Sequence, residues 1–233
     1  MARLADNRDS PLTAPEIATE ALRQFDGDGP EPSIRLLARA LDVTPSAIYH
    51  HYGSHAEIVQ GAIDLIWQEA AADTLATIPD PFTADPREVL FTAGIATRRA
   101  FGHHPRAAQH VAADWTPSDS LTAVLALMVN VLERLGLSGP RFEEVFHGYA
   151  SFVLGNVLFA AARNNAWTRR PESQSLPYDP NYDEDAKARA SEDGRRRINA
   201  IMSLSAVDPE RDEQLYARAL EQLLDGLLSP GGS

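Results

Sequence analysis

The 233-residue chain contains no cysteine, which excludes disulfide bonds, thiolate metal sites and a cysteine nucleophile. Only one of its 21 basic residues, Lys187, is a lysine, so phosphate contacts have to come from arginine, histidine or neutral donors. Acidic residues outnumber basic ones by 33 to 21, and the net charge of −12 provides no bulk attraction to nucleic acid or to an anionic membrane. Residues 1–7 lack the basic-then-apolar pattern of a secretory signal, so we expect a cytoplasmic protein.

One stretch, residues 145–162, contains no charged residue and is long enough to be considered as a membrane span. Polar and small residues interrupt it, and Gly148, Ser151 and Gly155 follow one helical stripe at spacings of three and four residues. Small residues along a stripe let a second helix approach closely. We therefore expect no membrane span here, but a soluble helix that is buried on all sides.

Helical spacing dominates the rest of the chain, and no segment alternates as a strand would. The 44% of apolar residues suffice for a sizeable core, so the sequence predicts an all-α protein. Capping residues predict where the first four helices begin: Thr13 with Glu16, Ser33, Thr44 before Pro45, and Ser54 with Glu57. The third of these helices is expected over residues 45–51, and the fourth extends toward Ala76.

The larger C-terminal part consists of longer helices separated by proline clusters. Residues 143–163 and 209–228 both predict helices with a broad apolar face. Residues 169–186, between them, have little to bury and predict a loop or a partly disordered insert. We expect two domains, residues 1–60 and residues 61–233.

Two short helices joined by a tight connection, with a third capped helix directly after them, predict a helix-turn-helix. Its sequence, SIRLLARALDVTPSAIYHHY over residues 33–52, closely resembles the DNA-binding region of the TetR family of transcriptional regulators. The resemblance covers about residues 13–66. Weaker similarity at residues 98–100, residues 152–158 and the last helix points to the branch with a tetracycline-repressor-like C-terminal domain. The resemblance implies an all-α homodimer with an N-terminal three-helix DNA-binding head and a C-terminal ligand-binding and dimerisation domain.

The chemistry of the helix-turn-helix residues fits contact with double-stranded DNA. A recognition helix needs short polar groups at its N-terminus for the major groove and hydrogen-bond donors along its flank for the phosphates. The resemblance and this chemistry give an expected DNA-contacting set: Ser33, Arg35, Thr44, Pro45, Ser46, Tyr49, His51 and His55. Two of them have a plainer alternative, since Thr44 also caps a helix and Tyr49 can serve in packing, whereas His51 and His55 are expected to contact phosphate.

Two residues depart from the family pattern within the head. Asp42 stands where the family usually has glycine in the turn, and aspartate tolerates the left-handed backbone better than most residues. His55 stands where a lysine is usual, and free histidine is mostly uncharged near neutral pH. Residues 1–60 carry nine acidic and five basic residues, a net charge of −4. We expect weak non-specific affinity for DNA and a shallow dependence of binding on salt.

Aromatic and polar residues between the fourth helix and the last helices suit a small-molecule site, although the same residues describe an ordinary core. The expected ligand-binding set is Trp67, Phe91, Phe101, His104, His110, Trp115, Met128 and Phe152. A magnesium–tetracycline complex is not expected, because family contact positions align by eye with Ala71, Ala93 and Thr97, and the acidic metal partner aligns with Ala162. A hydrophobic or aromatic effector fits better, and we expect no cofactor and no resident metal.

The two long apolar helices predict a four-helix interface between two copies of the chain, with burial inside one subunit as the alternative. The expected interface set is Phe142, Val145, Tyr149, Phe152, Gly155, Leu220, Leu223, Leu224 and Leu227.

The predicted function is that of a ligand-responsive repressor that binds a palindromic operator as a homodimer. The alternative is a helical ligand-binding protein or sensor that has weakened or lost DNA binding. An enzyme is not expected, since the chain has no His-Glu-x-x-His motif, no glycine-rich phosphate loop and no Gly-x-Ser-x-Gly turn.

Overall fold

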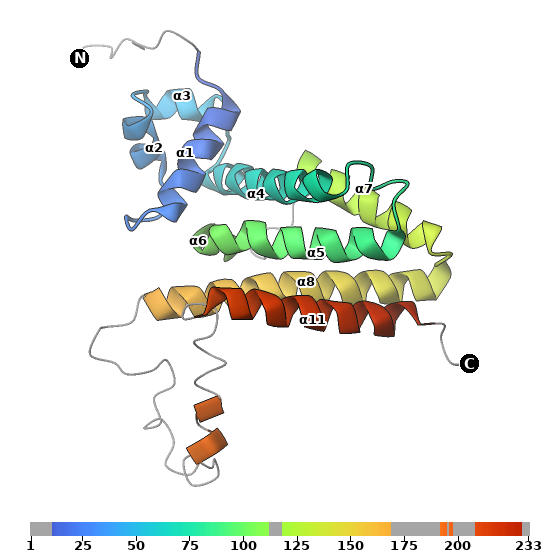
Figure 1. Ribbon diagram of the computed structural model, residues 1–233. Coiled ribbons are helices and arrows are strands. Elements are labelled where there is room, and N and C mark those ends of the chain that lie inside the picture. Colours follow the sequence, from blue (N-terminus) through green and yellow to red (C-terminus); the bar gives the residue numbers. More distant parts are fainter. Residues whose placement is uncertain (1–10, 112–117, 169–191, 195, 198–207, 230–233) are drawn as a thin grey trace, which may run out of the picture.

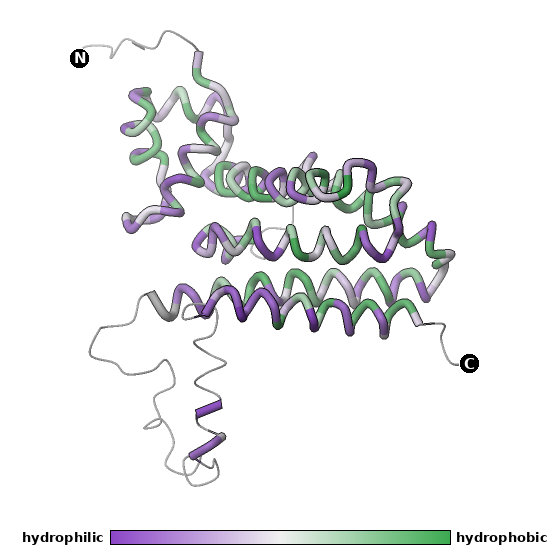
Figure 2. Tube along the Cα trace, in the orientation of Figure 1, coloured by the Kyte–Doolittle hydropathy of each residue, from purple (hydrophilic) through white to green (hydrophobic). Residues whose placement is uncertain are grey.

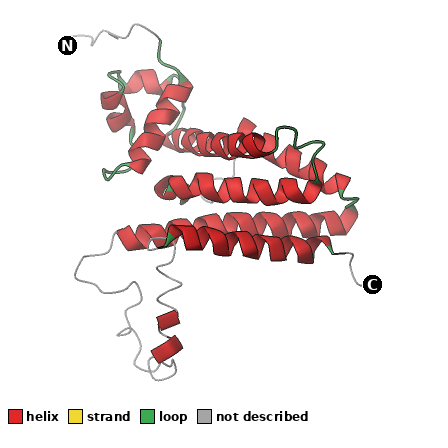
Figure 3. Cartoon of the chain, viewed as in Figure 1, coloured by secondary structure: helices red, strands yellow, loops and turns green. Residues whose placement is uncertain are grey.

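A computed structural model describes residues 11–111, 118–168, 192–194, 196–197 and 208–229, and these residues form helices and loops without a strand (Figure 3). The prediction of an all-α fold is thus confirmed. The loop predicted over residues 169–186 lies outside the described residues.

Three short helices form the N-terminal head: α1 over Ala14–Asp26, α2 over Ile34–Ala40 and α3 over Pro45–Tyr49 (Figure 1). The predicted caps are confirmed, because the hydroxyls of Thr13, Ser33 and Thr44 accept hydrogen bonds from backbone N–H groups three residues onward. The third helix ends two residues before its predicted end, since the N–H of His51 bonds to the carbonyl three residues before it and tightens the chain into a turn.

The turn between α2 and α3 depends on Asp42, whose φ of 53° lies in the left-handed region. The N–H of Val43 donates to the carbonyl of Ala38 at 2.9 Å, which closes the end of α2 as a glycine would at this position. The expectation that the turn survives without glycine is therefore confirmed.

Longer helices form the core below the head: α4 over His55–Thr77, α5 over Pro86–His103, the short α6 over Pro105–Ala108, α7 over Asp119–Arg134, α8 over Gly139–Thr168 and α11 over Pro209–Leu228. In Figure 1, α4 and α7 form one side of the core, α5 lies in the middle, and α8 and α11 lie side by side on the opposite side. The predicted domain boundary at residue 60 falls inside α4, which runs from the head into the core without interruption.

Two hydrophobic clusters fill the molecule. The first joins the head to α4, the end of α5, α6 and the C-terminal half of α8, and includes Phe25, Ile48 and Phe101. The second lies between α5, α7, α8 and α11, and includes Leu132 and Leu220. Figure 2 shows hydrophobic residues prevailing along α7 and α8, whereas α11 alternates between hydrophobic and hydrophilic residues.

Helix α8 is long and apolar enough to cross a membrane by length and composition, but it packs within the core against α5, α6, α7 and α11. Only 33% of its most apolar window is buried. The expectation of burial on all sides is therefore wrong, because Ser151, Gly155 and Phe159 form an exposed stripe opposite the buried face. That stripe lies on the outer side of the core.

A close contact fixes α5 against α11 and α8. A methyl group at Gly94 would lie 2.7 Å from Leu220 Cδ2 and 3.2 Å from the Tyr149 hydroxyl, so only glycine allows this approach. One turn onward, Arg98 donates to Asp212 of α11 and to Asn156 of α8, each at 2.6 Å. The three helices are thus joined by the close packing of α5 at Gly94 against Leu220 and Tyr149, and by the buried ion pair between Arg98 and Asp212.

Candidate functional site

The helix α3 presents polar side chains to solvent over a buried anchor. Ile48 is fully buried in the head, whereas Ser46, Tyr49 and His51 on the same short helix and its end are exposed. Tyr49 is 53% exposed, which is unusual for a large aromatic side chain and does not fit the packing alternative. Their contact with DNA stays a prediction.

Other members of the expected DNA-contacting set lie around α3. Arg35 is exposed on the first turn of α2, and Pro45 begins α3 exposed to solvent. Ser33 and Thr44 use their hydroxyls as helix caps, with N–H to Oγ distances of 3.3 Å. Their hydroxyl hydrogens stay free to donate to a phosphate, because a cap uses only the oxygen lone pairs.

His55, at the first residue of α4, binds the chain just before α2. Its Nε2 lies 2.8 Å from the carbonyl oxygen of Pro32, and because a carbonyl only accepts, Nε2 carries the proton. This contact joins the start of α4 to the helix-turn-helix, a structural role that sequence reasoning did not foresee for this residue.

A carboxylate already occupies the N-terminus of α4, beside His55 of the expected DNA-contacting set. Glu57 accepts from the N–H of Gly53 at 2.8 Å and from the Ser54 hydroxyl at 3.3 Å. The predicted capping pair is therefore present in a modified form, with Gly53 as the backbone donor. Its negative charge offsets part of the helix dipole that would attract an anion.

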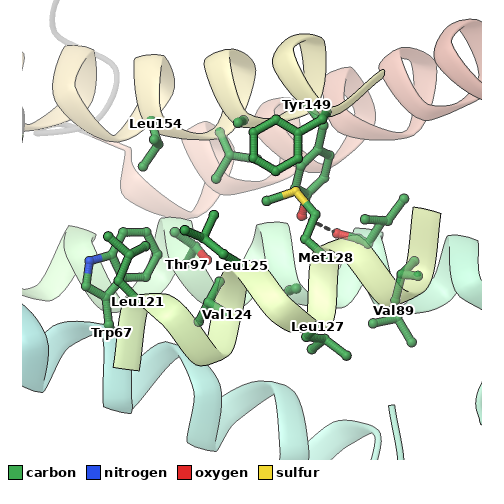
Figure 4. Close-up of a pocket in the computed structure, with 16 residues that line it drawn as sticks. Trp67, Val89, Thr97, Leu121, Val124, Leu125, Leu127, Met128, Tyr149 and Leu154 are labelled. Atoms are coloured by element: carbon green, nitrogen blue, oxygen red, sulfur yellow. Dashed lines mark hydrogen bonds between the residues drawn. The ribbon is translucent and has the colours of Figure 1, made fainter. Parts of the chain in front are cut away.

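An apolar cavity of about 120 Å³ lies in the core between α4, α5, α7 and α8. Figure 4 shows Trp67 of α4 at one end and Tyr149 of α8 with Met128 of α7 at the other. Its walls combine residues of both hydrophobic clusters, so the cavity separates the cluster that contains the head from the cluster that contains α11.

Few polar atoms lie near the cavity, and one of them already makes a hydrogen bond to the backbone. The Tyr149 hydroxyl donates to the carbonyl of Leu90 at 2.7 Å, as the dashed line in Figure 4 marks. Burial raises the pKa of the Tyr149 hydroxyl far above its ordinary value, so the group stays neutral. Thr97 supplies the other hydroxyl in the wall. No charged side chain lines the cavity among the described residues, which favours an uncharged occupant.

The structure places only part of the expected ligand-binding set at this cavity. Trp67 and Met128 line the cavity, and Trp115 lies outside the described residues. The remaining five lie elsewhere: Phe101 packs edge-on behind Trp67, Phe152 stacks on Tyr216, Phe91 packs in the second cluster, and His104 and His110 face the head. His104 binds the carboxylates of Asp26 and Glu69, whereas His110 packs against Phe25 with Glu31 3.6 Å from its Nε2.

Sequence reasoning missed most of the cavity wall because α7 and the middle of α8 carry aliphatic residues that look like ordinary core. The missed lining residues are Val89, Leu90, Ala93, Thr97, Leu121, Val124, Leu125, Leu127, Val131, Phe146, Tyr149, Ala150, Val153 and Leu154. The alignment with family contact positions gave the one usable indication, since Ala93 and Thr97 do line the cavity whereas Ala71 does not.

The residues of the expected dimer interface fall into a buried group and a more exposed group within the single chain. Val145, Tyr149, Leu220 and Leu224 are buried inside a single chain, so for these the alternative of burial within one subunit holds. The others are exposed or partly exposed on α8 and α11: Phe142, Phe152, Gly155, Leu223 and Leu227. Among the residues of these two helices whose exposure the structure describes, the most exposed large apolar ones are Phe159 and Leu215, which the sequence analysis did not select.

The described residues contain no group of three or more histidine, aspartate and glutamate side chains placed to hold a metal ion. His110 lies 3.6 Å from Glu31 and packs against Phe25.

Known structures share the fold of this chain over nearly its whole length. A possible TetR-family regulator from Streptomyces coelicolor A3(2) superposes with a TM-score of 0.66 at 20% identity, over 92% of this chain and 98% of that chain. ActR of Streptomyces coelicolor in complex with actinorhodin superposes with a TM-score of 0.65 at 21% identity, over 96% of this chain and 99% of that chain. Mycobacterium smegmatis BioQ superposes with a TM-score of 0.62 at 23% identity, over 94% of this chain and 99% of that chain. No protein-family model and no curated protein matches the chain. At these identities the likeness establishes the architecture, and the chain has the fold of the TetR-family transcriptional regulators.

Proposed function

We propose that the protein is a ligand-responsive transcriptional regulator, a homodimeric repressor that binds a palindromic operator and releases it when a small apolar effector enters the core. The observation that carries this proposal is the helix-turn-helix, in which the exposed Ser46 and Tyr49 stand on the buried anchor Ile48. A short helix fixed by one apolar anchor, with its polar face free, is the arrangement that presents side chains to a major groove.

The cavity supports an effector of matching chemistry. At about 120 Å³ it is slightly smaller than the engineered cavity of about 150 Å³ in another protein that binds benzene. Its aliphatic wall offers no counter-charge, so the proposed effector is an uncharged molecule with at least one ring-sized apolar part. ActR of Streptomyces coelicolor, which shares this fold, binds actinorhodin in its crystal structure, so the fold can hold a small molecule.

The position of the cavity supports its coupling to the head. Trp67 contacts the cavity and belongs to the cluster that contains the head, whereas Val131 and Tyr149 belong to the other cluster. A ligand that fills the space packs against both clusters, so any change in their separation is transmitted along α4, which begins in the head and carries Trp67.

The exposed faces of α8 and α11 support a homodimer. The two helices lie side by side on the outer side of the core (Figure 1), and Phe159 and Leu215 expose large apolar surface there. Gly155 would meet no neighbouring atom within 4 Å if it carried a methyl group, which leaves room for another helix to approach. A two-fold dimer of the heads binds two equivalent half-sites, and therefore a palindrome.

Selection of DNA fragments from a random double-stranded library tests DNA binding. We expect enrichment of a palindromic sequence, and loss of most of its affinity in Tyr49→Ala. Phe82→Ala is a matched control, because Phe82 has nearly the same exposure, 54% against 53%, but lies in the loop between α4 and α5. Absence of any enriched sequence would refute the repressor function and favour the alternative of a ligand-binding protein without DNA binding.

Binding of benzene, measured by calorimetry, tests the cavity. Ala150→Leu places a larger side chain in the cavity and is expected to abolish binding, whereas Ala162→Leu on the exposed side of α8 is expected to leave it unchanged. Equal binding by the two variants would show that benzene enters elsewhere.

A further inference from the structure

A cluster of two histidines and two carboxylates joins the head to the core, and the cavity and the helix-turn-helix make no use of it. We call Asp26, Glu69, His103 and His104 the junction cluster. Asp26 is the last residue of α1, Glu69 lies on α4, and the two histidines end α5 just before α6. The cluster therefore links the head, the helix that enters the core and the helix that lines the cavity.

His104 stands at the centre of this cluster. Its Nδ1 lies 2.8 Å from the Asp26 carboxylate, and its Nε2 lies 3.1 Å from the Glu69 carboxylate. Its side chain is only 15% exposed, so water does not compete freely for either nitrogen. The imidazole ring thus bridges the end of α1 to α4.

The chemistry of this bridge decides its protonation state. A neutral imidazole has one N–H group, whereas an ionised carboxylate only accepts hydrogen bonds. Two carboxylates can therefore both be bound only when His104 carries a proton on each nitrogen. We propose that doubly protonated His104 is a positioning residue that holds the head against the core, and that the head loosens when His104 loses a proton.

The other charged groups around His104 act in the same direction or do not titrate. His103 of α5 binds the second oxygen of Glu69 at 2.7 Å, so it too favours an ionised Glu69. Arg106 of α6 donates to the carbonyls of Gly27 and Gly29 after α1, and it stays charged at every relevant pH. His110 lies 3.6 Å from Glu31 in the same loop. The Arg106 contacts and the hydrophobic cluster between head and core therefore remain when the histidine bridge is broken.

The acid limit of the bridge follows from Glu69. Burial alone would raise the pKa of Glu69, but its hydrogen bonds to His103 and His104 outweigh burial and lower it below the ordinary value of 4.5. A lowered carboxyl pKa contributes stability above the ordinary value and loses it as pH falls through the lowered one. The bridge is therefore complete at mildly acidic pH, where Glu69 is ionised and histidine is protonated, and it weakens toward alkaline pH.

Amide hydrogen exchange of the full-length protein tests this proposal without DNA. We expect protection of residues 22–29, corrected for intrinsic exchange, to fall by about threefold to tenfold between about pH 6 and pH 8.5, because a partly exposed ion pair is modest in strength. In His104→Gln, which retains a single donor group, protection is expected to be low and independent of pH. His147→Gln is the matched control, since His147 on α8 bonds only locally to Ser151.

Asp26→Asn gives a second test, because the bridge and the helix dipole of α1 predict opposite changes in the rate of amide exchange. Asp26 is a negative charge at the C-terminus of α1, so its neutralisation should by itself stabilise the helix and slow exchange. The bridge predicts the opposite at pH 6, an acceleration of about threefold or more, because His104 loses its charged partner. Slower exchange in Asp26→Asn, a flat pH profile in the native chain, or the native profile in His104→Gln would each overturn the proposal.

The consequence for operator affinity rests on the proposed repressor function, whereas the exchange measurement does not. Loss of DNA binding with an intact pH profile of exchange would therefore refute the function and leave the bridge standing. Loss of the pH profile of exchange with intact DNA binding would refute the bridge and leave the proposed function standing.

Discussion

The junction between the core and the head and the cavity inside the core have opposite chemistry. The junction with the head is joined by ionised and histidine side chains, with His104 between Asp26 and Glu69. The cavity is lined by aliphatic and aromatic side chains, and its tyrosine hydroxyl is engaged by the backbone. Less than one turn of α4, from Trp67 to Glu69, and less than two turns of α5, from Thr97 to His103, separate the two places.

Ligand binding in the cavity and attachment of the head to the core therefore depend on different physical interactions. Filling an apolar cavity contributes through buried area and is insensitive to pH and salt, whereas contacts between ionised groups depend on both. Changes to buried contacts around the core should therefore have large effects on stability. Changes in the head should have smaller effects that appear mainly in DNA binding.

The largest effect is expected at the buried ion pair between α5 and α11. Asp212→Asn leaves Arg98 and Arg163 buried beside a neutral partner, and we expect the free energy of unfolding to fall by about 3 kcal/mol or more in urea denaturation. Glu213→Gln is the matched control: it breaks the pair with Arg99 between the same helices at the same 2.6 Å, but that pair is half exposed. It should cost less than about 1 kcal/mol. Equal losses would show that burial does not set the strength of these pairs.

The next largest effect is expected where α5 approaches α11. Gly94→Ala should lower the free energy of unfolding by about 1 to 2 kcal/mol, since the new methyl group meets the fully buried Leu220. Gly226→Ala on α11 meets no atom within 4 Å and should raise stability by about 0.5 to 1 kcal/mol through helix propensity. A stabilising Gly94→Ala in the same thermal unfolding experiment would contradict the close packing described for this interface.

A smaller effect is expected in the turn of the helix-turn-helix. Asp42→Gly removes the left-handed strain at φ 53° and should raise the free energy of unfolding by about 0.5 to 1 kcal/mol. Asp42→Asn removes the same charge but tolerates the same conformation, so its stability should stay within a few tenths of a kcal/mol of the native chain. If the two variants gained equally, charge rather than backbone conformation would be the cause.

The smallest effect is expected at the N-terminus of α4 and concerns DNA affinity. Glu57→Gln retains acceptors for the N–H of Gly53 but removes a negative charge near the proposed phosphate contacts, and should tighten operator binding about twofold to fivefold. Glu88→Gln makes the same change in the first turn of α5 and should leave affinity unchanged. Parallel changes in the two variants would indicate a general charge effect.

Local signals in the sequence predicted much of the head, and tertiary packing decided the remainder. The caps at Thr13, Ser33 and Thr44 and the left-handed turn at Asp42 are determined within a few residues, so they could be read directly. The predicted start of the last helix, at residue 209, also agrees with the structure.

The cavity and the interface could be predicted only in part, because periodicity does not tell which neighbour covers an apolar face. Val145 and Leu220 look like interface residues in sequence, yet they are buried inside one chain. His104 looked like a ligand-binding residue among aromatics, but carboxylates more than 30 residues away bind it. Such contacts follow from the packing of distant helices, which no local pattern encodes.

The central claim is that the head binds a specific DNA sequence despite its negative net charge. Fluorescence anisotropy of the full-length protein on the selected palindrome and on a scrambled duplex, over a series of salt concentrations, tests it most directly. The account predicts that the palindrome binds about a thousandfold or more tighter than the scrambled duplex, and that affinity falls as salt rises with a shallow slope. Equal affinity for the two duplexes, or no salt-sensitive binding to either, would contradict it.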